Sequence, residues 1–305
     1  MIRDLVGPIK VIRAQSKAAY PYCHCLYVDG ETRAVFDTGA GVRSLAGLDT
    51  QSIDLVIYSH YHPDHTHGHE LFAGARYCIH ALDYPAMVSR EDYLYFSGVH
   101  MWEKLMSEPK LEYGAMMRQL HPDPDFPDVS VRPKRIDMTF QDGYTFDFGT
   151  TKATVIHTPG HSPGHCCFFF EREGVLFSGD IDLIPFGPWY GSYLANVDDF
   201  LASIEKLKIL EPSAVVSCHR RYLTENITAE LEAFREKILE REAKVLKCLS
   251  APRTLDELAC CHIIYEQHFH PYYLFWEKMM ILKHLERLER MRVVNTDGER
   301  WFIET

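Results

Sequence analysis

The sequence lacks several features that would place the protein in other classes. No apolar run approaches the ~20 residues that a membrane-spanning helix needs, and no low-complexity or collagen-like stretch is present. The nine cysteines form no CxxC pair, and a chain of 305 residues can bury a core without disulfides. Residues 1–7 carry Arg3 and Asp4 and no apolar stretch of the signal-peptide kind. We therefore expect free thiols, a cytoplasmic location and no membrane contact.

A basic stripe is also absent. The chain has 32 Lys and Arg residues against 43 Asp and Glu residues, which gives a formal net charge of −11. Non-specific nucleic-acid binders usually present a basic surface, so the composition disfavours such a partner, although a local basic patch would escape this count. Histidine, in contrast, is concentrated, because five of the 17 histidines fall between His60 and His69. Clustered imidazoles are typical of a metal site.

Short apolar segments predict a sheet-rich main domain. At roughly 150 residues per domain, the length suits one large domain and a small one, or two domains. Apolar patterns rich in β-formers predict strands at residues 22–28, 33–36, 53–59, 75–80, 144–148, 152–157, 166–170, 174–178 and 213–217. The Asp29-Gly30 pair predicts a hairpin between the first two segments. Residues 198–210 predict a helix with Asp198 as its N-cap, and residues 228–249 predict a long helix that leads out of the main domain.

Residues 83–135 differ in composition, being rich in Tyr, Met and Trp, and predict a helical insert with a long loop. Such an insert acts either as a lid or substrate wall or as an aromatic cap or dimer surface. We expect the insert and the C-terminal module, residues 253–305, to line the mouth of the active site. A homodimer interface formed by the same regions is the alternative.

The C-terminal residues predict a small unit of their own. Residues 254–265 and 271–291 predict two helices, and the alternation around Asp297-Gly298 predicts a hairpin. Two helices followed by a hairpin form a winged-helix pattern. We therefore divide the chain into a domain at 1–225 and a second part at 226–305, which comprises the linking helix and the winged-helix-like unit.

Four of the predicted strands run directly into side chains that can bind metals. Side chains at the carboxyl ends of neighbouring strands converge at one edge of a sheet, so distant residues can share one site. One closed structural zinc needs only four ligands, whereas a larger set suits two ions with open positions for water and substrate. The candidate ligands are His60, His62, Asp64, His65, His161, Asp180 and His219.

These motifs have the order of a known family. The HxHxDH run from His60 to His65, followed by TPGHSPGH, SGD and SCH, with FDTG ahead of them, resembles the metallo-β-lactamase superfamily over roughly residues 20–225. The resemblance is to its glyoxalase II and β-lactamase-like hydrolase branch. It implies an α/β fold of four layers, αββα, followed by the winged-helix-like unit. It also implies that His60, His62 and His161 hold a first metal, that Asp64, His65 and His219 hold a second, that Asp180 bridges both and that Asp37 orients the ligands from behind.

The resemblance implies a metal-dependent hydrolase in which two divalent ions generate a bridging hydroxide. Zinc is the expected metal, with iron or manganese as alternatives. Asp64 and Asp180 would orient the hydroxide, and Asp64 would accept its proton. Asp180 stands where zinc β-lactamases usually have Cys, so antibiotic hydrolysis is disfavoured. Leu183 stands where lactonases of this fold carry Tyr, which argues against a lactone substrate.

A small thioester or ester, including an acyl thioester, is the expected substrate. The alternative is a nuclease, because a lactamase domain followed by a winged helix resembles an endoribonuclease group of the same superfamily. Residues 251–305 carry seven Lys and Arg against nine Asp and Glu residues, which argues against a phosphate-binding track. An iron oxidoreductase and a ligand sensor are further alternatives.

Several neighbours of the motifs are expected to have roles other than metal binding. His67 and His69 are expected outside the ligand set, because seven ligands suffice. His165 has either an orienting or a packing role, while His157 is expected to pack and Asp182 to lie in a polar loop. The aromatic residues of the following segment suit an apolar substrate wall or simple packing, and two tyrosines among them are candidate donors to an oxyanion. These aromatic residues are Phe186, Trp189, Tyr190 and Tyr193.

Overall fold

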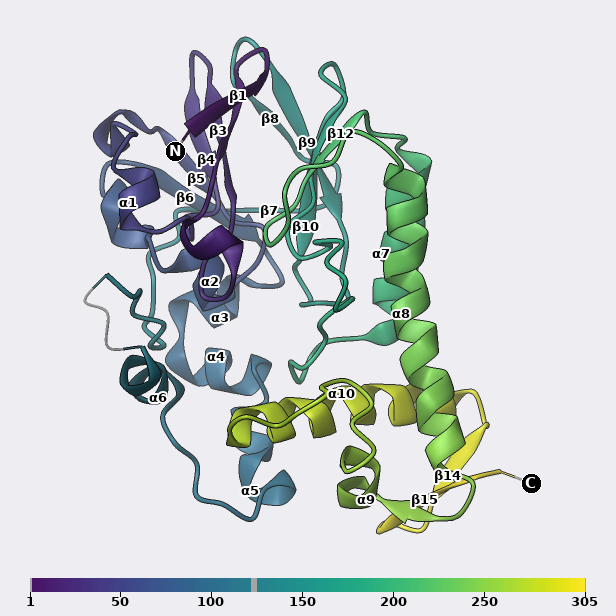
Figure 1. The fold of residues 1–305 in the computed structure, drawn as a ribbon. Helices are drawn as coiled ribbons and strands as arrows, with labels where there is room; N and C mark the ends of the chain where they lie inside the picture. The colour runs from purple at the N-terminus through teal and green to yellow at the C-terminus, as the bar shows by residue number, and fades with distance from the viewer. Residues whose placement is uncertain (1, 122–124, 305) are drawn as a thin grey trace.

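The computed structural model describes residues 2–121 and 125–304. Two sheets form the centre of the molecule (Figure 1). The first sheet has the order β1-β2-β3-β4-β5-β6-β7, and its strands are β1 (Ile2–Val6), β2 (Ile9–Ile12), β3 (Cys25–Asp29), β4 (Arg33–Phe36), β5 (Leu55–Ile57), β6 (Arg76–His80) and β7 (Met138–Phe140). Strands β1 to β4 pair antiparallel, whereas β4 to β7 pair parallel.

The second sheet has the order β12-β11-β10-β9-β8. Its strands are β8 (Thr145–Asp147), β9 (Lys152–His157), β10 (Cys166–Phe170), β11 (Val175–Phe177) and β12 (Ala214–Val216). Strands β11 and β12 pair parallel, whereas the others pair antiparallel. Successive residues of β11 and β12 face opposite sides, since Phe177 and Val216 join the core between the sheets while Leu176 and Val215 join a second core under the helices.

The core between the sheets is built from aromatic rings. Phe36 of the first sheet contacts Phe168, Phe170 and Phe177 of the second, with ring centroids 4.8, 5.7 and 5.9 Å apart. All four rings are fully buried. Aromatic pairs of this kind add to the free energy gained from burying their surface. The two sheets therefore form one rigid support for the loops at their ends.

Helices cover the outer faces of both sheets. Beside the first sheet lies α1 (Val42–Leu45) (Figure 1). The same part of the chain forms the 3₁₀ turns η2 (Thr50–Ser52) and η3 (His69–Phe72), while α2 (Pro63–Thr66) and η1 (Gln15–Ala18) contribute residues to a cavity at the strand ends. On the side of the second sheet lie α7 (Val197–Ile209) and α8 (Ile227–Cys248), whose buried residues pack with Leu176 and Val215. The observed α/β architecture agrees with the fold class predicted from the sequence.

The region predicted as a helical insert forms short helices, namely α3 (Tyr84–Val88), α4 (Arg90–Phe96), η4 (Val99–Met101), α5 (Trp102–Leu105) and α6 (Tyr113–Leu120). The chain ends in β13 (Arg253–Thr254), α9 (Leu255–Ala259), α10 (Pro271–Arg290), β14 (Val294–Thr296) and β15 (Arg300–Ile303). Figure 1 shows α8 running from the level of the sheets to these C-terminal elements. Trp102 of the insert packs on Tyr272 and Phe275 of α10, with ring centroids 4.7 and 5.0 Å apart.

Two local predictions need correction, and one hairpin was missed. The N-cap of α7 is Asn196, whose side chain accepts from two backbone N–H groups, and Asp198 lies in the first turn. The helix that begins after Thr254 ends at Ala259 and does not reach Tyr265, although Thr254 and Glu257 form the capping box that starts it. The β1-β2 hairpin was not predicted, because charged residues interrupt its apolar pattern. The three strands of the terminal unit have the order β13-β15-β14, and the winged-helix comparison stays a prediction.

Within the described part of the chain, no helix has both the length and the apolar character needed to cross a membrane.

Candidate metal centre

The loops at the strand ends bring the seven predicted ligands together. His60 follows β5, and His62 is the N-cap residue of α2, a single turn that Pro63 opens and that carries Asp64 and His65. His161 lies between β9 and β10, Asp180 follows β11 and His219 follows β12. Their ligating atoms fall into two neighbouring groups, one of His60, His62, His161 and Asp180 and one of Asp64, His65 and His219.

Three imidazole nitrogens meet in the first group. His161 Nε2 lies 3.1 Å from His60 Nε2 and 2.8 Å from His62 Nδ1, and these last two atoms are 3.0 Å apart. A hydrogen bond between two ring nitrogens needs a proton on one nitrogen and a lone pair on the other. One N–H can serve only one of the three contacts, so the three nitrogens cannot all be paired with one another by hydrogen bonds. A cation placed among them would use all three lone pairs.

Asp180 lies between the two groups. Its Oδ2 is 3.3 Å from His161 Nε2 and 3.8 Å from His60 Nε2. Its Oδ1 is 3.0 Å from His65 Nε2 and 3.4 Å from His219 Nε2. One oxygen therefore faces each group, which is the orientation that a bridging carboxylate requires.

The second group closes around Asp64. Its Oδ2 lies 3.3 Å from His219 Nε2 and 3.6 Å from His65 Nε2. Within the described residues, the buried atoms His65 Nε2 and Asp180 Oδ1 lie 3.0 Å apart, yet neither makes a hydrogen bond of acceptable geometry to the other or to a third residue. Buried polar atoms rarely stay unpartnered unless an ion or water serves them. The two carboxylates also supply negative charge that suits divalent cations, so the residues fit a pair of metal ions.

In each candidate histidine, the ring nitrogen that points away from the other ligands contacts a fixed partner. A second contact of this kind sets the tautomer and the ring orientation of a metal ligand. The partners are Ser59 Oγ for His60 at 3.0 Å, Ser192 Oγ for His62 at 3.2 Å, Asp37 for His65 at 2.8 Å, the Trp189 carbonyl for His161 at 2.8 Å and the Ala18 carbonyl for His219 at 2.9 Å. Of these partners, only Asp37 was identified from the sequence.

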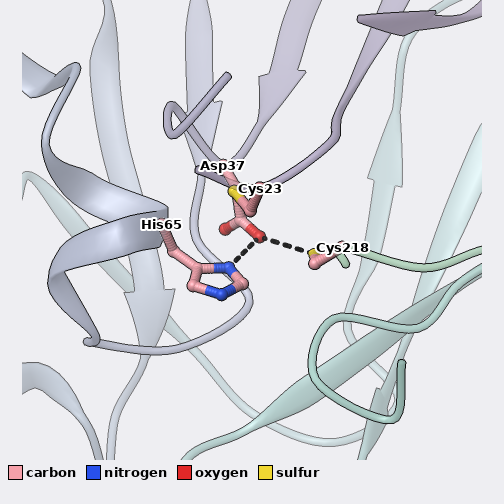
Figure 2. A group of neighbouring side chains, drawn as sticks. All are labelled: Cys23, Asp37, His65 and Cys218. Atoms are coloured by element: carbon pink, nitrogen blue, oxygen red, sulfur yellow. Dashed lines mark hydrogen bonds and ion pairs between the residues drawn. The ribbon is translucent and has the colours of Figure 1, made fainter. Parts of the chain in front are cut away.

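Asp37 is fully buried behind the second group (Figure 2). Its carboxylate accepts from His65 Nδ1 at 2.8 Å, from the Ser59 N–H and Oγ at 2.8 Å each, and from Cys218 Sγ at 3.6 Å. The thiol of Cys23 lies beside this network, and its ligating atom is within 4.8 Å of the others. Because the carboxylate oxygens are engaged by these donors, the geometry suits an orienting role for Asp37.

Burial and charge act in opposite directions on the titrating groups. Burial lowers the pKa of His60 and that of His62 well below the ordinary value, so both rings are neutral as metal ligands must be. Burial alone would raise the pKa of Asp64, but the adjacent His65 and His219 bring it down to about 2. Asp64 is therefore a carboxylate at neutral pH.

The neighbouring histidines have separate contacts. His165 Nε2 accepts from the Asp180 backbone N–H at 3.0 Å, so this residue supports the loop that carries Asp180. His67 Nε2 contacts the Gly39 carbonyl at 3.1 Å, and His69 Nδ1 contacts the Tyr58 hydroxyl at 2.9 Å. His157 stacks on His80 with ring centroids 4.3 Å apart. None of these four side chains belongs to either of the two groups of candidate ligands.

A cavity of about 1270 Å³ opens onto the centre. Candidate ligands from both groups reach it, and so do residues of the insert and of the C-terminal module, as predicted. Phe186 and Trp189 line this cavity, but Tyr190 and Tyr193 do not. Tyr190 is fully buried and its hydroxyl contacts His284 Nε2 at 2.8 Å, so the packing alternative holds for this tyrosine.

The comparison with known families agrees with this geometry. The sequence profile described as the metallo-β-lactamase superfamily matches residues 21–219, which is more than half of the chain. The chain therefore belongs to the metallo-β-lactamase superfamily.

Two proteins similar to this chain are named as a hydrolase and a thioesterase. The chain is 33% identical over 115 residues to a hydroxyacylglutathione hydrolase of Rhodospirillum rubrum, over 35% of this chain and 44% of that protein. It is 27% identical over 198 residues to the acyl-coenzyme A thioesterase MBLAC2 of Gallus gallus, over 60% of this chain and 65% of that protein. The matched part is thus less than two thirds of the length of either relative. Both names agree with the prediction of a hydrolase.

A solved structure shares the fold over nearly the whole chain. The metallo-beta-lactamase family protein TTHA1429 from Thermus thermophilus superposes with a TM-score of 0.70 and 22% sequence identity, covering 98% of this chain and 100% of that one. At this identity the likeness concerns the fold alone, and it includes the insert and the C-terminal elements.

Proposed function

We propose that the protein is a dinuclear metal-dependent hydrolase of acyl thioesters. The observation that carries this proposal is the shared geometry of the five histidines, each with one nitrogen at the centre and the other held by a fixed partner, around a carboxylate that faces both groups. In this assignment one ion is held by His60, His62 and His161, the other by Asp64, His65 and His219, and Asp180 contacts both.

When bound, the two ions supply a Lewis acid and a water activated for attack on a carbonyl carbon. We propose zinc as the resident metal, because imidazole nitrogen and carboxylate oxygen are its common ligands. Iron and manganese accept the same donors, so the metal content of the isolated protein is the deciding measurement.

The chain itself performs the remaining tasks. Asp64 and Asp180 orient the attacking water, and Asp64 accepts its proton. A thiolate is a good leaving group because its conjugate acid has a low pKa, so it departs without a proton donor. Tyr190 and Tyr193 do not line the cavity and therefore offer no proton to a poorer leaving group.

The names of the two relatives support the same bond type, since one is an acyl-coenzyme A thioesterase and the other a hydroxyacylglutathione hydrolase. The acidic net charge of −11 supports a small-molecule substrate over RNA. The elements after residue 225 include α10, whose residues line the cavity beside the centre. We propose that they form a winged-helix-like domain that serves as a substrate wall.

The test is an activity panel combined with metal analysis. The purified protein would be assayed against acyl-CoA, acylglutathione and acyl-N-acetylcysteamine thioesters, a lactone and single-stranded RNA, before and after chelation. We expect two metal ions per chain and thioester hydrolysis that chelation abolishes and added zinc restores. Cleavage of RNA without thioester turnover would overturn the proposal in favour of the nuclease alternative.

A further inference from the structure

Many of the side chains that line the cavity beside the metal centre are aromatic. Its volume of about 1270 Å³ exceeds the ~300–1,000 Å³ of common small-molecule sites. The walls come from parts of the chain that are far apart in sequence, including the N-terminal segment 17–20, the insert, the loop after β11 and the first turns of α10. The reacting carbonyl group would occupy only the part of the cavity next to the metal ligands. Most of the volume is therefore available to another part of the substrate.

A continuous row of rings leads away from the centre. Trp189 contacts His62 and His161, with ring centroids 5.5 and 5.7 Å apart, and its other neighbour is Trp276 of α10 at 5.9 Å. Trp276 in turn contacts Tyr113 of α6 at 5.7 Å. The row therefore begins at the metal ligands, crosses the C-terminal module and ends in the insert.

Two aromatic side chains of the cavity wall, Trp189 and Tyr272, have their polar atoms bonded to protein. Trp189 Nε1 donates to the Tyr265 hydroxyl at 2.9 Å, and the Tyr272 hydroxyl donates to the Leu111 carbonyl at 2.6 Å. These bonds join the loop after β11 to the C-terminal module and α10 to the insert. The ring faces are left for the cavity, in a wall that is fixed before any ligand arrives.

We propose that this aromatic wall binds the acyl group of the substrate, and that this group is a medium or long apolar chain. The inference rests on the proposed function, in which the thioester carbonyl lies at the centre. A chain that starts there passes Trp189 first, then Trp276 and Tyr113. Each methylene buried against such a surface improves binding by about three- to fourfold.

Binding of the acid product provides a test that needs no turnover. Dissociation constants for the linear carboxylates from butanoate to dodecanoate would be measured by calorimetry on the metal-loaded protein. We expect the constant to fall by about three- to fourfold per methylene until the chain passes the wall. An equal affinity for all chain lengths would overturn the inference.

Variants locate the effect on the wall. Trp276→Ala should flatten the dependence on chain length, weakening the binding of the longer acids by about tenfold or more and leaving butanoate unchanged. Trp301→Ala removes another half-buried tryptophan of the same C-terminal unit that does not line the cavity, and it should keep the full dependence. Tyr113→Ala, on α6, repeats the test from the other side if Trp276→Ala fails to fold. An unchanged dependence in the folded wall variants would contradict the inference.

The two proposals fail separately. A protein that binds longer acids progressively more tightly but hydrolyses no thioester would contradict the proposed function alone. A protein that hydrolyses acetyl and dodecanoyl thioesters equally well and shows no chain-length dependence in binding would contradict the acyl-wall inference alone.

Discussion

Asp180 is the residue on which the two groups of ligands depend. Its two oxygens face different groups, and Oδ1 is buried without a hydrogen-bond partner in the described part of the chain. Without a cation, the carboxylate would be a charge whose desolvation is compensated only by the surrounding imidazoles. We therefore expect the loss of Asp180 to affect metal binding more than the loss of any single histidine.

Asp180→Ala should lose at least one of the two metal ions and nearly all activity, because the change removes the side chain whose oxygens face both groups. Metal content by mass spectrometry and thioester turnover check this expectation. Asp147→Ala, at an exposed position of β8, is the control and should change neither. Full metal content with normal turnover in Asp180→Ala would show that the carboxylate is not shared.

Asp37 is expected to act more weakly, since it reaches the centre indirectly, through His65 and through Ser59 to His60. Asp37→Ala removes the acceptor for His65 Nδ1 at 2.8 Å and for two donors of Ser59. We expect metal affinity or activity to fall by about 10- to 100-fold, as for other groups that orient ligands. A titration with zinc measures it, and excess zinc should rescue part of the activity. A loss as complete as that of Asp180→Ala would instead indicate direct ligation.

At the scale of elements, the loop after β11 connects the metal centre to α8. Arg241 of α8 is 4% exposed and donates to the carbonyls of Pro188 at 2.5 Å and Phe186 at 2.6 Å. The same loop supplies the Trp189 carbonyl that accepts from His161 and the Ser192 hydroxyl beside His62. Arg241 is thus a positioning residue that acts on two ligands through the loop.

Arg241→Met keeps the aliphatic stem but leaves these buried carbonyls without donors. We expect the free energy of unfolding to fall by about 2–4 kcal/mol, and zinc affinity to fall by about tenfold through the loosened histidines. Chemical denaturation and a zinc titration measure the two effects. Lys247→Met, at an exposed position of the same helix, is the control. Stability loss with unchanged zinc affinity would contradict the positioning role.

The sequence predicted the strands that carry the candidate ligands, but not most of the hydrogen-bond partners that orient the histidine rings. Short apolar runs ending in His or Asp are local patterns, and β5, β9, β11 and β12 fall within the predicted ranges. The partners of the histidines are not local, because Ala18 is 201 residues from His219 and Trp189 is 28 residues from His161. Backbone carbonyls have no residue signature, so only the folded chain identifies these two contacts.

At the scale of the whole molecule, the protein buries many imidazoles outside the metal centre. His80 is 4% exposed and stacks on His157, and burial lowers its pKa to about 4. Burial lowers the pKa of His24 and of His69 to about 4 as well. The unfolded chain binds protons at these positions near pH 6.5, whereas the folded protein resists protonation until about pH 4.

The low pKa of buried His80 makes the folded protein less stable in acid. Between pH 6.5 and about 4 the unfolded state holds more protons at His80 than the folded state, so the free energy of unfolding falls as the pH falls. Below about pH 4 the group contributes no further change. Asp83 acts in the opposite sense, because burial raises its pKa to about 7. A comparison of variants is therefore needed to isolate one histidine.

We expect His80→Phe to weaken the loss of stability on acidification. Phenylalanine can keep the stacking on His157 but binds no proton, so the fall between pH 7 and pH 4.5 should shrink by about 1–3 kcal/mol. Urea unfolding of the chelator-treated protein at the two pH values measures the difference and keeps metal release out of the result. His100→Phe, at an exposed imidazole that stacks on Tyr95, is the matched control and should follow the parent protein. If both variants lose stability as steeply as the parent, neutral burial of His80 does not contribute to acid sensitivity.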